Sequence, residues 1–284
     1  MKTSLAALLT TLGLLLLTGS AYAQVNVFDQ SERWFSLGAD LGFYAGSQNG
    51  VDHANMSMIL HAGGRIHENV DLELQLPGTL HAYSDGTEDE VRFRFANPSI
   101  GAYFVTQNKI GMWRLGGFFA APLASVPGGT GIDHIVAADA YGYASAMRGN
   151  WNYWLWAPST TTIGASSQLE WSVLPVLSLA ADGALAALID SGNGRAQSDM
   201  MGQLAGEAAL KAGEVVRLGV RLAGVWLPTA DGDNFQSFVE PFARLQFLMA
   251  YVFAAVTINL DEPNGFSFDS GKVWAIRAGG GLRF

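Results

Sequence analysis

The sequence predicts an all-β protein, namely a transmembrane antiparallel up-and-down β-barrel of about 12 strands with one helical extracellular loop. Three observations predict this fold class. Apolar residues make up 49% of the chain and charged residues only 14%, against about 25% in ordinary soluble domains. Apolar and small or polar residues alternate in one segment after another. No apolar run after residue 24 approaches the 18 residues of a membrane-spanning helix. The chain has no cysteine, which excludes disulfides, thiolate metal sites and cysteine nucleophiles.

The first 23 residues have the pattern of an export signal. Lys2 is followed by an apolar run from Leu5 to Leu17, and Ala21 and Ala23 flank a tyrosine in a small-x-small cleavage pattern. The sequence therefore predicts a signal peptide over 1–23, cleaved after Ala23, and an outer-membrane β-barrel domain over 24–284. An uncleaved anchor is the alternative.

Alternation with a period of two marks the predicted strands. In the last one, Trp274, Ile276 and Leu282 fall on one face, and Arg277 and Arg283 fall on the other. The predicted segments of this kind span residues 32–46, 54–67, 70–81, 91–106, 109–122, 159–173, 176–190, 200–211, 214–228, 235–248, 251–261 and 271–284. The non-apolar face is rich in Gly, Ala, Ser and Thr. A soluble β-sandwich would expose a more highly charged face, so the pattern favours a barrel with an apolar exterior.

The connections between these segments alternate in length. Every second connection has two or three residues, as at 107–108 and 174–175, whereas the others are longer and polar, such as HAYSDGTEDE (81–90) and GSQNGVDH (46–53). Short turns at one end and long loops at the other are typical of outer-membrane barrels, whose short turns face the periplasm. A hairpin hidden in 80–90 or 123–158 would raise the count to 14 strands.

The C-terminal segment RAGGGLRF (277–284) ends in an aromatic residue after alternating apolar positions. In this it resembles the bacterial outer-membrane β-barrel superfamily. The stretches 75–77 and 97–104 resemble uncharacterised transporter-type, porin-like barrels. The resemblance implies a Gram-negative outer-membrane location, contact with outer-membrane lipid and lipopolysaccharide, and recognition of Phe284 and its strand by the barrel-assembly machinery. A sequence pI near 4.9 and the lack of a basic patch argue against nucleic acid as a partner.

The alternation also assigns charged side chains to the barrel lumen. The predicted lumen residues are Asp40, Arg65, Asp71, Glu73, Arg92, Arg94, Arg114, Glu170, Asp182, Glu207, Arg217, Arg221, Glu240, Arg244, Arg277 and Arg283. Either these charges pair across strands and stiffen a narrow or plugged barrel, or the arginines line a path that prefers anions. The loops carry mostly acidic residues, with Arg148 among their few bases.

The connection 123–158 is much longer than the others. Apolar residues recur at helical spacing, which predicts an amphipathic helix over 133–148 on or inside the outer mouth. Thr130 and Asp133 have capping-box spacing, and Gly149 follows as a stop. The loop is either a functional lid or a packed cap without a ligand. The aromatic residues after it favour a membrane-interface girdle, with stacking on a substrate at the mouth as the alternative; they are Trp151, Tyr153, Trp154 and Trp156.

The sequence shows little sign of chemistry. His53 follows Asp52 and His134 follows Asp133, but adjacent residues of an extended chain point apart, and no G-x-S-x-G motif accompanies them. We therefore expect no enzyme, no catalytic residue, no metal and no cofactor. The leading expectation is a passive channel or transporter for small molecules, with an unidentified solute. The alternatives are a structural or adhesive barrel with a closed lumen and a surface-loop hydrolase.

Overall fold

The computed structural model describes residues 35–48, 50–108, 111–190, 197–213, 215–227, 234–269 and 272–284. The predicted signal peptide lies outside these residues. The strands are β1 (Phe35–Gln48), β2 (Val51–His67), β3 (Val70–Ser84), β4 (Asp89–Phe95), β5 (Ser99–Gln107), β6 (Gly111–Ala120), β7 (Thr160–Leu174), β8 (Leu177–Asp190), β9 (Gln197–Ala212), β10 (Val216–Trp226), β11 (Phe235–Gln246), β12 (Ala250–Asn259) and β13 (Trp274–Arg283).

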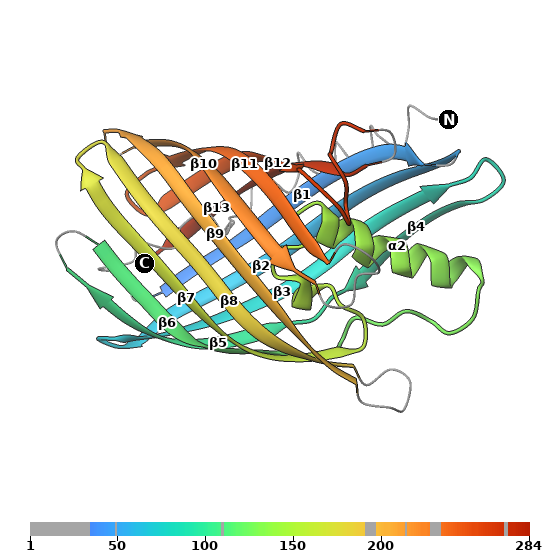
Figure 1. Ribbon diagram of the computed structural model, residues 1–284, viewed down its shortest axis with the longest axis horizontal. Helices are drawn as coiled ribbons and strands as arrows, with labels where there is room; N and C mark the ends of the chain where they lie inside the picture. Colours follow the sequence, from blue (N-terminus) through green and yellow to red (C-terminus); the bar gives the residue numbers. More distant parts are fainter. Residues whose placement is uncertain are drawn as a thin grey trace.

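These strands form one closed antiparallel barrel (Figure 1). Consecutive strands pair with each other except β4 and β5, and β1 also pairs with β13, which closes the sheet. The inner part of β3 (70–75) pairs with β5 and its outer part (78–84) pairs with β4. β4 and β5 therefore occupy one position, and the barrel has the 12 strands that the sequence predicted.

The predicted strand 91–106 is interrupted between β4 and β5. Pro98 lacks the N–H that a strand ladder needs. Asn97 turns inward instead, where its amide nitrogen donates to the carbonyls of Trp154 and Ala157 at 2.9 and 2.7 Å and its oxygen accepts from Ala124 N at 2.8 Å. At the break, hydrogen bonds between strands are thus replaced by hydrogen bonds from Asn97 to the long connection between β6 and β7.

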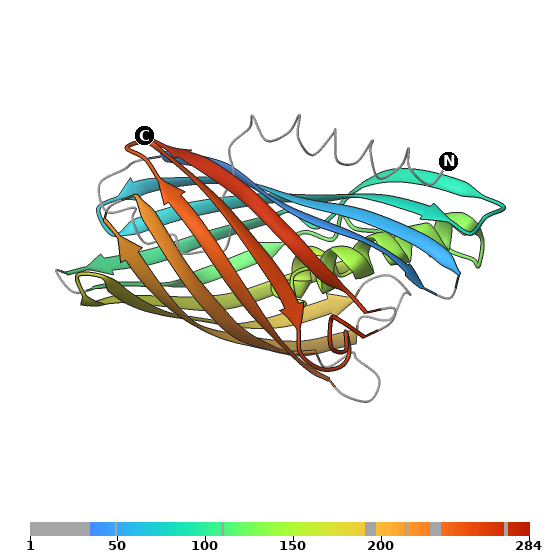
Figure 2. The same cartoon turned by 90° about the horizontal axis from the view of Figure 1, so that it is seen from above.

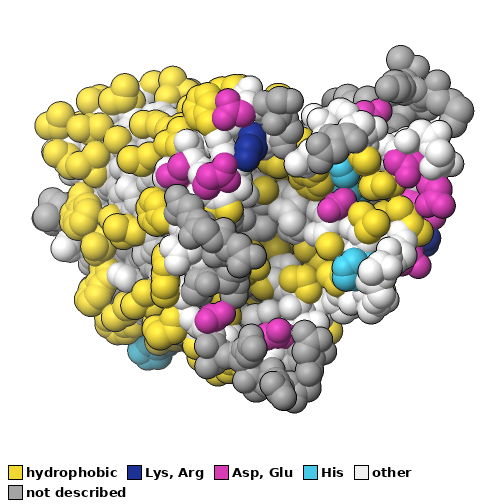
Figure 3. All heavy atoms as spheres, turned by 45° about the vertical axis from the view of Figure 1, so that its right-hand side comes forward, with side chains coloured by type: hydrophobic (Ala, Val, Ile, Leu, Met, Phe, Trp, Pro, Cys, Tyr) yellow, Lys and Arg dark blue, Asp and Glu magenta, His cyan; other side chains and the backbone are white. Residues whose placement is uncertain are grey.

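The predicted register is confirmed. In β3, Leu72, Leu74 and Leu76 are exposed, whereas Asp71, on the opposite face of the strand, is buried. Figure 3 shows hydrophobic side chains covering the left of the view, whereas the acidic side chains lie from its middle to its right. An exposed apolar band is what a lipid environment requires of such a wall.

Two predicted loops are shorter than expected. The segment 46–53 is a tight hairpin in which Ser47 pairs with Asp52, and β3 and β4 similarly extend to Ser84 and Asp89. The prediction was wrong here because a strand that extends beyond the bilayer needs no apolar face, so its polar sequence resembles a loop. β1 to β4 consequently project at the outer end of the barrel, where the long connections lie (Figure 1).

The long connection forms a helix, α2 (Ile132–Ala146), and a short 3-10 helix, η1 (Tyr153–Leu155). The helix matches the prediction within two residues, but the capping box does not form: Gly131 is the N-cap and no side chain caps the helix. α2 packs against β2, β3 and β4 (Figures 1 and 2). None of the described helices combines the length and apolarity needed to cross a bilayer.

Candidate functional site: the lumen and its inserted segment

The residues between β6 and β7 fold into the barrel. Trp151, Trp154 and Trp156 are all buried, with Trp156 only 1% exposed. The Trp154 ring stacks on Phe118 of β6 at 4.4 Å, and the Trp151 ring meets Phe238 of β11 edge-on at 6.4 Å. The prediction of a membrane-interface girdle is therefore wrong. Tryptophan serves either place, because its large apolar ring can be buried against a protein wall as well as against lipid.

Arg148, which the sequence placed in an exposed loop, lies at the centre of this inserted segment. Its guanidinium donates to the two carboxylate oxygens of Asp40 at 2.7 and 3.1 Å and to Ser57 Oγ at 3.3 Å. Arg148 and Asp40 are 1% and 0% exposed. Asp40 also pairs with Arg277, which in turn pairs with Glu240. One base from the segment thus completes a buried network of charges on the wall.

Uncharged side chains on several other strands also hold the segment. Asn55 of β2 donates to the Ala140 carbonyl at 3.1 Å, and Asn259 of β12 donates to the Ala146 carbonyl at 3.0 Å. Gln203 of β9 makes two hydrogen bonds with Asn152, each of 2.9 Å. Because these strands lie on different sides of the barrel, the segment spans the lumen from wall to wall.

Most of the predicted lumen charges lie inside the barrel and are paired. The ion pairs besides those of Asp40 and Glu240 are Arg65–Asp71 (3.0 Å), Arg114–Glu73 (2.6 Å), Arg217–Glu170 (3.2 Å), Arg217–Glu207 (3.4 Å) and Arg221–Asp182 (3.1 Å). The guanidiniums of Arg244 and Arg283 lie over the Tyr251 ring, at 4.3 and 5.0 Å from its centroid.

Two predicted lumen residues differ from the rest. Arg92 is 47% exposed and pairs with Glu90 and with Asp133 at the start of α2, and Arg94 donates to the Asp133 carbonyl at 3.3 Å. β4 belongs to the part of the wall that projects outward, so its inner face meets α2 instead of the central lumen.

A small polar chamber remains beside the inserted segment. It has a volume of about 90 Å³. Charged side chains of the wall and aromatic rings of the segment line it, among them Glu73, Arg114, Asp182, Arg221, Trp151 and Trp154. With both charge signs and two indoles at its surface, the chamber offers hydrogen bonds and stacking to a small polar solute.

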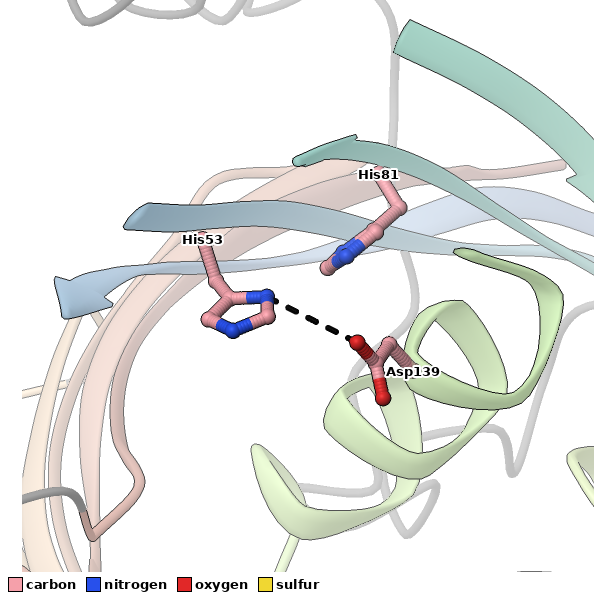
Figure 4. A group of neighbouring side chains, drawn as sticks. All are labelled: His53, His81 and Asp139. Carbon is pink, nitrogen blue, oxygen red and sulfur yellow. Dashed lines mark ion pairs between the residues drawn. The ribbon is translucent and has the colours of Figure 1, made fainter. Parts of the chain in front are cut away.

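Three residues from separate elements meet at the outer mouth (Figure 4). His53 Nδ1 of β2 lies 3.8 Å from Asp139 Oδ2 of α2, and His81 of β3 lies beside them. Burial raises the pKa of Asp139, and the adjacent His53 opposes this effect. His134 is elsewhere, with Nδ1 2.8 Å from the Pro127 carbonyl. Two imidazoles and a carboxylate are groups that can hold a metal ion.

Sequence reasoning missed this group because it paired each histidine with its chain neighbour. His53 also fell in a predicted loop, where alternation assigns no face. Had the strand been extended, alternation would have placed His53 and His81 on the same inner face. Nothing in the sequence locates Asp139 next to them.

No family model and no curated protein matches the chain. Among solved structures it is similar to an outer-membrane channel from Pseudomonas putida F1, with a TM-score of 0.60 and 11% identity over 92% of this chain and 100% of that chain. It is also similar to the NanC porin (TM-score 0.51, 8% identity, 87% and 99% covered). A third similar structure is the translocator domain of the autotransporter NalP from Neisseria meningitidis (TM-score 0.50, 12% identity, 90% and 91% covered). The fold of this chain is therefore that of the bacterial outer-membrane β-barrels.

Proposed function

We propose that the protein is a passive outer-membrane channel for small solutes, and that the segment between β6 and β7 closes its lumen in the conformation described here. The observation that carries this proposal is the way the segment is held. It enters from the outer end and is held by the Arg148–Asp40 pair, by a few amide hydrogen bonds and by the packing of its aromatic rings on the wall, with a polar chamber beside it. A single connection held in this way can leave without disturbing the strand ladders.

The printed names of two similar structures are in line with this proposal, since one is an outer-membrane channel and the other a porin. The lumen wall is also polar and charged along its length. In the proposed open state, Arg114, Arg217 and Arg221 and their carboxylate partners would line the path. Because each arginine keeps a partner, we expect weak charge selectivity and no strong preference for anions.

A structural barrel with a permanently closed lumen is the second candidate. It is favoured by the extent of ion pairing and by the packing of Trp151 and Trp154 against opposite walls. We place a surface-loop hydrolase last, because the His53–Asp139 pair has no nucleophile among its described contacts.

Solute uptake distinguishes the two leading candidates. The refolded protein is inserted into liposomes, and swelling is followed with sugars and amino acids of increasing size. The matched variant replaces residues 126–157 with a short glycine-serine linker, which can close the gap because Ser159 N donates to the Ala124 carbonyl at 2.7 Å. Measurable swelling of the intact protein that becomes faster in the variant, limited to small solutes, supports a plugged channel. Swelling confined to the variant, or absent from both proteins, supports the closed structural barrel.

We further propose two partners on the basis of the fold. Phe284 is 55% exposed on the outer surface of the barrel and its ring lies 6.5 Å from that of Phe35. It is thus accessible for recognition of the C-terminal strand by the barrel-assembly machinery. At the outer end, Asp85, Glu88 and Asp89 form part of an acidic rim that would meet lipopolysaccharide through bridging divalent cations.

A further inference from the structure

The side chains of His53, His81 and Asp139 converge on one point at the outer mouth (Figure 4). In the β2–β3 ladder His53 pairs with Tyr83 and Asn55 pairs with His81, so the two histidines are diagonal neighbours on the inner face. Their ring centroids are 5.6 Å apart. Asp139 approaches from α2, and one ligand atom from each residue lies within 4.8 Å of the other two.

Two nitrogen atoms of this cluster lack a hydrogen bond. Among the described residues, His53 Nδ1 and His81 Nε2 are buried without a hydrogen-bond partner. His81 is fully buried and His53 is 8% exposed. Buried polar atoms are nearly always satisfied, and leaving one unsatisfied costs about 1–3 kcal/mol. Neither nitrogen therefore has a hydrogen bond within the described part of the protein, since even Asp139 Oδ2 lies 3.8 Å from His53 Nδ1.

A metal ion can serve as the partner of both nitrogens. In a tetrahedral zinc site the bonds are about 2.0–2.1 Å, which sets neighbouring ligand atoms about 3.3 Å apart. The 3.8 Å between His53 Nδ1 and Asp139 Oδ2 is near that value, and small side-chain rotations would bring His81 to it. Asp52 adds further negative charge near His53. We propose that His53, His81 and Asp139 form a binding site for a divalent transition-metal ion of the zinc type.

Asn55 is suited to orient His81 in this site. Its amide nitrogen lies 3.2 Å from His81 Nδ1, and its oxygen accepts from Thr79 Oγ1 at 3.0 Å. Binding through Nε2 requires the proton on Nδ1, so the Asn55 amide must turn its oxygen toward that nitrogen and give up its hydrogen bond to the Ala140 carbonyl. Thr79 Oγ1 can then accept from the amide and donate to the Ala140 carbonyl, 3.5 Å away, in place of the bond from Asn55. Metal-bound histidines usually donate their other ring N–H to an oxygen in this way.

The position of the site indicates what the ion would do. Asp139 is 32% exposed and gives the ion access from the outside. His53 and His81 belong to the wall, whereas Asp139 belongs to α2, so a bound ion would fasten the helix to β2 and β3. This inference does not depend on transport through the lumen.

The test is zinc titration of the refolded full-length mature protein by calorimetry, together with the visible absorption spectrum of the cobalt(II)-loaded protein. We expect one ion per chain and the intense absorption typical of a four-coordinate site with nitrogen and oxygen ligands. His53→Gln, His81→Gln and Asp139→Asn should each weaken binding at least tenfold. His134→Gln is the matched control, since it removes an imidazole from the same mouth outside the cluster, and it should bind as the wild type does.

Asp139→Asn is the variant that we expect to fold even if the histidine variants do not, because its side chain is partly exposed on the helix and belongs to no strand. Far-UV circular dichroism and the heat-dependent electrophoretic shift of folded barrels establish that each variant is folded. The proposal is overturned if the wild type shows no saturable binding, if folded Asp139→Asn binds as tightly as the wild type, or if His134→Gln loses binding equally.

Discussion

Replacing Arg148 with alanine should release the inserted segment from the barrel wall. The substitution removes two hydrogen bonds to the Asp40 carboxylate and one to Ser57 Oγ, all in a site where neither charged side chain is more than 1% exposed. Breaking a buried ion pair by removing one partner typically costs about 3–5 kcal/mol. Asp40 retains Arg277, so we expect the lower value, about 3 kcal/mol.

That free energy corresponds to roughly a hundredfold shift from the docked to the undocked segment, because each 1.4 kcal/mol changes an equilibrium tenfold. Single-channel recording in planar bilayers measures it as the open probability. Arg92→Ala is the matched control, since Arg92 is 47% exposed and such surface pairs contribute about 0–1 kcal/mol. If Arg148→Ala and Arg92→Ala have the same open probability, the Arg148–Asp40 pair does not hold the segment and the reasoning is refuted.

Three further changes test separate parts of the structure. Gly149 has a φ of +61° and an added Cβ would overlap the Phe238 ring. Gly149→Ala should therefore weaken docking by about 1–3 kcal/mol and speed tryptic cleavage after Arg148; an unchanged cleavage rate would contradict this. Leu74→Arg on the lipid face should lower the free energy of unfolding in bilayers by about 2–4 kcal/mol, measured by urea titration, and an unaffected variant would mean that this face does not meet lipid. The Asp85 carboxylate accepts hydrogen bonds from the Thr87 hydroxyl and from the backbone N–H groups of Glu88 and Thr87, which hold its pKa at about 2, below the usual 3.8. Its contribution to the turn is therefore present above about pH 4 and is lost as the pH falls through about 2, and Asp85→Asn should show the faster amide exchange at Thr87 at every pH.

The fold could be predicted because the strand period is a local property. In β10, Leu218, Val220 and Leu222 are exposed while Arg221 between them is buried, as the alternation indicates. One face of each strand meets lipid and the other meets the lumen. An alternation with a period of two therefore shows which side chains of the whole strand face the lumen. The same reasoning gave the strand number, because β4 and β5 continue one another.

The site could be predicted only in part. Alternation placed Asp40, Glu240 and Arg277 on the inner face, but it did not reveal that Arg148, 108 residues after Asp40, completes their network. A base in a long polar connection resembles a solvated loop residue, and only the three-dimensional path of the connection brings it inside. The predicted place of the tryptophans was wrong for a related reason, since the same rings suit a membrane interface and a packed lumen.

The lengths of two outer loops were also predicted wrongly. Beyond the bilayer a strand no longer needs an apolar face, so the residues at 46–53 lost the alternation that marks a strand. His53 lies in that region, and its partnership with His81 was hidden for the same reason.

The most direct test of the account is the ionic conductance of the protein in planar bilayers, measured for the intact mature chain and for the variant in which a short linker replaces residues 126–157. The account predicts a closed or rarely open intact protein and a variant with stable conductance steps and weak charge selectivity. Equal, continuous conductance from both proteins would show that the segment does not close the lumen. Silence from both would show that the barrel is not a channel.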